Sequence, residues 1–119
     1  MTDPIEAQLA TVTATQAEVL GRYWARAREL VPEAVAATYY AMPALKVGDR
    51  GLVSLMPTKR GYSVYPYGNR PVEEVLERHP GHAHTKGSVH FTDAAPLPIE
   101  VFDDLVLTSR RLIGERKKS

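Results

Sequence analysis

Cysteine is absent from this sequence, and its absence removes several kinds of chemistry. Without thiols there are no disulfides, no thiolate metal ligands, no iron–sulfur ligation and no cysteine nucleophile. Long apolar runs are also missing, because Thr38 and Pro43 interrupt the most apolar stretch, residues 34–45. A bilayer span needs roughly 18 apolar residues in a row. The N-terminus has neither the basic nor the apolar segment of a signal peptide, so we expect no membrane segment and a cytoplasmic location.

A large charge of one sign is missing as well, since 15 basic and 14 acidic residues leave a net charge of +1. The basic residues are nevertheless concentrated near the C-terminus, where residues 115–119 form a basic tip. Cations at the C-terminal end of a helix are stabilised by the negative pole of the helix dipole. The sequence shows no wider basic face with interleaved aromatic residues, so we do not expect nucleic-acid binding.

Sequence motifs of nucleotide binding, zinc proteolysis, α/β-hydrolase chemistry and calcium binding are missing too. No serine or threonine has a histidine at a spacing that indicates a nucleophile–base pair. The sequence therefore gives no argument for an enzyme.

The pattern that is present predicts one domain over residues 1–119, with a helical extension at 4–31. Asp3-Pro4 and Thr13-x-x-Gln16 are typical of helix N-termini. An apolar stripe with helical spacing follows the second signature, and Trp24 is its largest member. Pro32 then predicts a short helix over 32–40, which Pro43 ends.

From residue 44 the apolar period changes from about 3.6 to 2, which indicates strands. In order, the pattern predicts strands at 44–47, 51–56 and 62–67, a helix at 72–79, a loop at 81–87, a strand at 88–91 and a final helix ending near Glu115. Tyr62 and Val64 are expected on one face of their strand. This order predicts an α+β fold, a single antiparallel sheet with helices packed on one face.

Histidines and carboxylates form the first candidate site. His82 and His84 project to the same side if their loop is extended. Glu73 and Glu77 are one turn apart on a predicted helix, and hard oxygen donors suit iron. These four residues are a candidate metal site, with a solvated loop and a solvated helix face as the alternative interpretation.

Lys86-Gly87 is the second candidate. A lysine followed by glycine can direct backbone N–H groups and an ammonium group toward one anion, such as a phosphate or a carboxylate. The tripeptide that it begins, Lys86-Gly87-Ser88, is short, so it favours anion binding without identifying a ligand.

Four segments in order resemble the YdhG-like family, a bacterial domain of largely unknown function. They are Tyr40-Ala41-Met42-Pro43, Tyr65-Pro66, residues 85–91 and Pro96-Leu97-Pro98, within a match of about residues 32–114. The resemblance implies a frataxin-like sandwich of helices on an antiparallel sheet. One branch of the family is described as an intracellular iron chaperone.

Three functions remain open at this point. The first is a non-catalytic module that binds a small anion, with Tyr40, Lys46, Tyr65 and Lys86 lining a hollow beside the sheet. The second is a frataxin-like iron-binding chaperone, with iron as its cargo. The third is an adaptor domain that binds a protein partner or a second copy of itself, for which an exposed apolar patch would be the sign.

Overall fold

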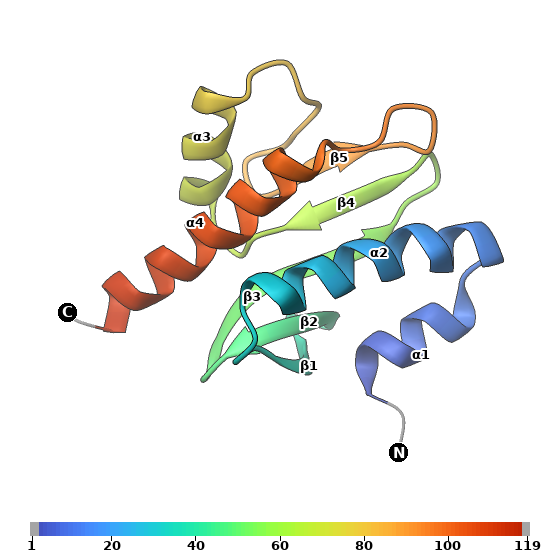
Figure 1. The fold of residues 1–119 in the computed structure, drawn as a ribbon, viewed down its shortest axis with the longest axis horizontal. Coiled ribbons are helices and arrows are strands. Elements are labelled where there is room, and N and C mark those ends of the chain that lie inside the picture. Colours follow the sequence, from blue (N-terminus) through green and yellow to red (C-terminus); the bar gives the residue numbers. More distant parts are fainter. Residues whose placement is uncertain (1–2, 118–119) are drawn as a thin grey trace.

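The computed structural model describes residues 3–117 as four helices and five strands (Figure 1). In chain order these are α1 (Pro4–Thr11), α2 (Ala14–Leu30), β1 (Val35–Tyr39), β2 (Met42–Val47), β3 (Arg50–Pro57), β4 (Tyr62–Tyr65), α3 (Asn69–Arg78), β5 (Val89–Phe91) and α4 (Ile99–Lys117). The last two residues of the predicted basic tip lie outside the described residues. No helix in the described part of the chain has the length and apolar character needed to cross a bilayer.

The five strands form one sheet in the order β1-β2-β3-β4-β5, and every neighbouring pair is antiparallel. Figure 1 shows α1, α2 and α4 on the same side of this sheet, with α3 packed beside α4. The predicted α+β fold with a single antiparallel sheet is confirmed. We call the side under these helices the helix face and the other side the far face.

Alternation along β4 separates the two faces. Tyr62 and Val64 are buried in the core, and the Tyr62 ring stacks on Phe91 of β5 at 5.0 Å between ring centroids. Phe91 in turn lies 5.0 Å from the ring of Tyr23 on α2. Ser63, between the two core residues, points the other way and contacts His90. The assignment of Tyr62 and Val64 to one face is therefore confirmed.

Both predicted helix starts are present. The Asp3 side chain accepts from the backbone N–H of Glu6 at 2.8 Å, and Thr13 and Gln16 form a reciprocal capping box. Such caps stabilise a helix by about 1 kcal/mol each. They fix where α1 and α2 begin.

A buried polar chain joins the N-terminal helices to the sheet. Trp24 of α2 donates from Nε1 to Oε1 of Gln8 at 2.9 Å, and Gln8 of α1 donates from Nε2 to the Leu55 carbonyl at 2.6 Å. Each of these buried groups has a partner, so the chain avoids the penalty of an unsatisfied polar group. Trp24 is the core anchor that its place in the apolar stripe predicted.

The helix predicted over residues 32–40 is wrong, because this segment forms β1. Val35, Thr38 and Tyr39 are β-branched or aromatic residues, which fit a pleated surface better than a helix. A tight turn then returns the chain along β2, and Val35 pairs with Lys46. Pro43 does not end a helix but lies within β2. The tertiary pairing outweighs the helix-start signal of Pro32.

The remaining boundaries differ by a few residues. The strand predicted to reach Tyr67 ends at Tyr65, because Tyr67 adopts a left-handed backbone with φ 54°. Helix α3 begins at Asn69 rather than at residue 72, and α4 continues past Glu115 to Lys117. The loop at 81–87 also makes one isolated strand-like bridge, between His84 and Val89.

Pairing between β2 and β3 is interrupted by a bulge. Leu45 pairs with Val53, but Lys46 pairs with Gly51, so Leu52 has no partner on β2. An extra residue in one strand shifts the alternation of side chains by one position, so the residues before and after it point to opposite faces of the sheet. Val53 therefore lies on the helix face, whereas Gly51 shares the far face with Lys46.

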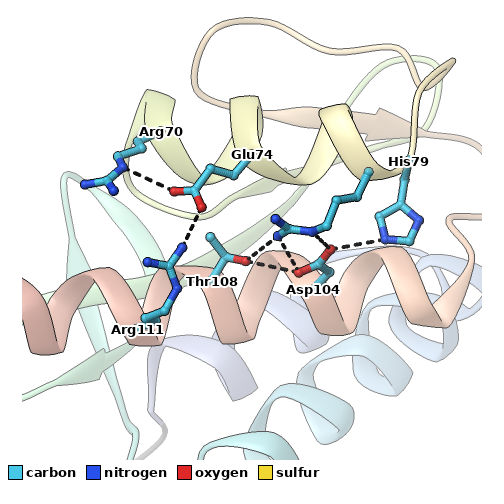
Figure 2. Close-up of polar contacts among 7 residues, drawn as sticks. Arg70, Glu74, His79, Asp104, Thr108 and Arg111 are labelled. Atoms are coloured by element: carbon cyan, nitrogen blue, oxygen red, sulfur yellow. Dashed lines mark hydrogen bonds and ion pairs between the residues drawn. The ribbon is translucent and has the colours of Figure 1, made fainter.

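Polar contacts fix α3 against α4 (Figure 2). Both oxygens of Asp104 accept from Arg78 at 2.8 Å, and His79 and Thr108 contact the same carboxylate at 3.1 Å. One turn away, Glu74 accepts from Arg111 of α4 at 2.6 Å. The hydrogen bonds from Arg78 are the main cause that lowers the pKa of Asp104 below its ordinary value.

We expect Asp104→Ala to lower the free energy of unfolding by about 2 kcal/mol at pH 7, because it removes hydrogen bonds to a charged group. A lowered pKa means that this stabilisation is present above the ordinary pKa of aspartate, about 4, and is lost as the pH falls through the lowered value. Urea unfolding of parent and variant should therefore converge in acid. Glu18→Ala, which breaks an exposed pair with Arg22, is the control and should cost less than about 0.5 kcal/mol. An equal loss for Asp104→Ala at every pH would contradict the assignment.

Candidate functional site

Three tyrosines meet at one end of the far face. They belong to the tyrosine pocket, a cavity of about 330 Å³. Its lining residues are Tyr39, Tyr40, Arg50, Gly51, Tyr67 and Gly68.

The three rings have a defined mutual arrangement. Tyr39 meets Tyr40 edge-on, with ring centroids 4.7 Å apart, and meets Tyr67 edge-on at 5.0 Å. Tyr40 and Tyr67 are closer to parallel, at 29° and 6.1 Å. The Tyr67 hydroxyl donates to the Tyr39 carbonyl at 3.1 Å. Edge-on and offset-stacked aromatic pairs of this kind are worth about 1 kcal/mol each beyond their buried area.

Two of the three tyrosines, Tyr40 and Tyr67, have a left-handed backbone conformation. Tyr40 and Ala41 form the β1–β2 turn with φ of 50° and 60°, values that a two-residue hairpin turn usually assigns to asparagine and glycine. Together with Tyr67 they are the non-glycine residues with positive φ in the described part of the chain. Such conformations cost on the order of 1–3 kcal/mol each and cluster at functional sites. The strain therefore marks this pocket as a candidate site.

Gly51 gives the rings room to lie on β3. A Cβ at this position would lie 2.6 Å from Cδ2 of Tyr39 and 2.7 Å from Cδ2 of Tyr67. Because the bulge at Leu52 turns Gly51 to the far face, the missing side chain creates space at the point where the two rings meet.

The charge at the tyrosine pocket is positive. Arg50 lines the cavity, and Nζ of Lys46 lies 5.0 Å from the centroid of the Tyr39 ring. Within residues 3–117, neither cation has a carboxylate within ion-pair distance. Burial is the main cause that raises the pKa of Tyr67 to about 12, so its hydroxyl keeps its proton at neutral pH.

A second cavity, which we call the α3 groove, has a volume of about 600 Å³. It lies between α3 and the loop before β5, and its lining residues are Val72, Glu73, Leu76, Glu77, His84, Thr85 and Lys86. Four residues predicted for two different sites thus meet here. The surroundings of Lys86 include two carboxylates, which disfavour an anion at this lysine.

The predicted metal ligands are divided between cavities. Glu73, Glu77 and His84 line the α3 groove, whereas His82 lines a third cavity of about 400 Å³ together with His90 and Arg60. Across residues 3–117, no three histidine or carboxylate side chains are grouped so that they could hold a metal ion.

The predicted anion-binding residues are divided as well. Tyr40 lines the tyrosine pocket and Lys46 contacts its Tyr39 wall, but Lys86 lines the α3 groove. Tyr65 is the half-buried last residue of β4 and lines neither cavity. At Gly87, an added Cβ would lie 3.7 Å from Oδ1 of Asn69, the first residue of α3. The structure does not bring these residues to one common hollow.

Sequence reasoning missed a hydrogen-bonded chain around His90. Nδ1 of His90 lies 2.6 Å from the Ser63 hydroxyl, and Nε2 lies 3.1 Å from that of Ser88. Ser88 continues to the Thr85 hydroxyl at 2.6 Å. Ser63 and Ser88 are buried, so the chain ties the loop before β5 to the sheet. Only the strand register, which pairs Ser63 with His90, reveals it.

Sequence reasoning also missed Tyr39, Arg50, Gly51 and Tyr67. No sequence signal marked them, because tyrosine and alanine are not the residues that indicate a left-handed hairpin turn. The left-handed backbone of Tyr40 and Ala41 is seen only in the structure.

We expect Gly51→Ala to destabilise the fold by about 2 kcal/mol, because the new methyl group overlaps two tyrosine rings. Chemical denaturation should show the loss, and near-UV circular dichroism should show altered tyrosine packing. Gly21→Ala is the matched control, because a Cβ there meets nothing within 4 Å and alanine favours the helix. An equal response of the two variants would contradict the close approach at Gly51.

Comparison with known proteins identifies the fold. No model of a known protein family matches the chain, and no curated protein matches its sequence. Among solved structures, it is similar to YdhG of Bacillus subtilis, a protein of the DUF1801 family, with a TM-score of 0.76 and 11% sequence identity. The match covers 87% of this chain and 85% of that one. The YdhG-like resemblance of the sequence motifs is thereby confirmed as a shared α+β fold.

Proposed function

We propose that this chain is a non-catalytic module that binds a small anion in the tyrosine pocket. The observation that carries the proposal is the lining of that pocket, three packed tyrosines and Arg50 with no carboxylate among them. A guanidinium group without an ion-pair partner attracts carboxylates and phosphates and binds both oxygens of such a group at once.

The tyrosines contribute the shape of the pocket. Their rings pack against one another and against the backbone at Gly51, so the walls are in place before a ligand arrives. A preorganised site loses less conformational entropy on binding. The Tyr67 hydroxyl, with its raised pKa, keeps the proton that it donates to the Tyr39 carbonyl and adds no competing negative charge.

Binding rather than catalysis fits the chemistry of the lining. The pocket has no histidine, carboxylate, serine or threonine that could serve as a base or a nucleophile. Tyr67 holds its proton too tightly, at a pKa of about 12, to act as a base near neutral pH.

The α3 groove is less suited to an anion, because Glu73 and Glu77 accompany Lys86 there. It also does not favour the iron-chaperone alternative. Lys86 places a positive charge in the groove, and only His84 joins the two carboxylates as a possible ligand. Anion binding in the tyrosine pocket is therefore the function that the geometry supports best.

We expect an anion to raise the melting temperature of the parent protein, and Arg50→Gln to remove most of that shift. The probes are inorganic phosphate, acetate, benzoate and phenyl phosphate at constant ionic strength. A ligand at ten times its Kd stabilises the folded state by about 1.4 kcal/mol. Losing the charge-assisted hydrogen bonds of Arg50 should weaken binding roughly tenfold or more in calorimetry.

Arg60→Gln is the matched control, because Arg60 is also an exposed arginine beside a turn but lines the third cavity. It should leave the affinity unchanged. The proposal fails if both variants respond alike, or if the parent protein binds none of the probes at tens of millimolar.

A further inference from the structure

The two edge strands of the sheet, β1 and β5, differ in whether their outer backbone groups are hydrogen-bonded. Beyond β5, the preceding loop folds back on the edge. The N–H of His90 donates to the Ala83 carbonyl at 2.8 Å, and the N–H of Thr85 donates to the Ser88 carbonyl at 2.9 Å. A loop that occupies the backbone groups of an edge strand prevents another strand from pairing there.

The β1 edge has no loop folded back on it, and α1 contacts β1 from the helix face (Figure 1). Nothing in the described residues pairs with the outer side of β1, which is the last strand on that side of the sheet. Residues 35–39 contain no charge and no proline, and their pairing with β2 has no bulge. Charged residues, prolines and bulges are the usual devices within a strand that keep an edge from pairing. Val35, at one end of β1, is 66% exposed, and Tyr40, just beyond the other end, is 77% exposed.

The hairpin turn determines which backbone groups of β1 are free. Tyr40 and Ala41 form a two-residue loop, so the flanking pair Tyr39 and Met42 is hydrogen-bonded. Hydrogen-bonded and non-hydrogen-bonded pairs then alternate along the hairpin. Ala37 consequently directs its N–H and C=O toward β2.

Ala36 and Thr38 direct theirs outward. Thr38 is opposite Pro43, which has no N–H to donate, and this agrees with a non-hydrogen-bonded pair at that position. The free edge therefore presents two residues, spaced two apart, whose backbone donors and acceptors face away from the sheet.

We propose that a second copy of this chain pairs with β1 in antiparallel orientation about a two-fold axis at Ala37. In this register Ala36 faces the partner's Thr38, and Thr38 faces the partner's Ala36. Both are outward-directed residues, so each pair exchanges both N–H···O bonds. The two copies of Ala37 are then directly opposite each other as a non-hydrogen-bonded pair.

The register also suits the side chains. Val35 and Tyr39 share the far face with Ala37, because side chains alternate along a strand. Two-fold symmetry about Ala37 places Val35 opposite the partner's Tyr39, so the exposed valine gains an apolar neighbour. The result is one continuous sheet of five strands from each copy, with both sets of helices on the same side.

A cysteine at the symmetry axis tests the register directly. The chain has no cysteine of its own, so Ala37→Cys provides one thiol per copy. The Cα atoms of a non-hydrogen-bonded pair are about 4.5 Å apart, within the range of a disulfide. We expect mild oxidation to link Ala37→Cys into a covalent dimer at least tenfold faster than Thr38→Cys, which has no like residue opposite it.

Introducing a charge at Ala37 provides the second test. Ala37→Asp and Ala37→Lys should each be monomeric in light scattering, because like charges face each other across the axis, and a one-to-one mixture should form dimers. Circular dichroism checks that each variant is folded, and the cysteine test does not depend on these variants. A parent protein that stays monomeric up to millimolar concentration would overturn the proposal. Equal linking rates for the two cysteine variants would overturn the register.

Discussion

Burial of one face of the sheet under α2 and α4 is the constraint on which the other features depend. It forces residues along β4 to alternate, with Tyr62 and Val64 in the core and Ser63 directed away from it. The far face is thereby released from core packing. Polar and strained groups that could not be placed against the helices are found there, including the His90 chain and the tyrosine pocket.

The bulge at Leu52 connects that constraint to the candidate site. Leu52 contributes its side chain to the core, and its carbonyl lies 2.7 Å from the hydroxyl of Ser109 on α4. The same extra residue turns Gly51 to the far face, beneath the rings of Tyr39 and Tyr67. The bulge therefore affects both faces of the sheet. On the helix face it supports packing against α4, and on the far face it leaves the space in which the tyrosines meet.

The sequence predicts those features that depend on neighbouring residues. The caps at Asp3 and Thr13 and the alternation at Tyr62 and Val64 are local signals, and all agree with the structure. The segment at 32–40 fails because its conformation depends on pairing with β2, and its proline resembles a helix start.

The candidate site was harder to predict than the fold. Tyr40 was recognised, but its neighbours Arg50 and Tyr67 come from separate segments that a bulge and a left-handed residue bring together. Neither the bulge nor the left-handed backbone follows from residue type, since leucine and tyrosine usually adopt other conformations. Lys86 was assigned by its glycine neighbour, and only the packing of its loop against α3 shows the carboxylates around it.

The loop that folds back on β5 has a consequence for how far copies of this molecule can assemble. A sheet that is open on both sides can add molecules without limit, as fibrils do. Here the His84–Val89 bridge closes the β5 side, so within residues 3–117 the β1 side is the one left open to strand addition. Under the proposed pairing along β1, addition of one further copy therefore leaves only closed β5 edges, and the sheet grows no further.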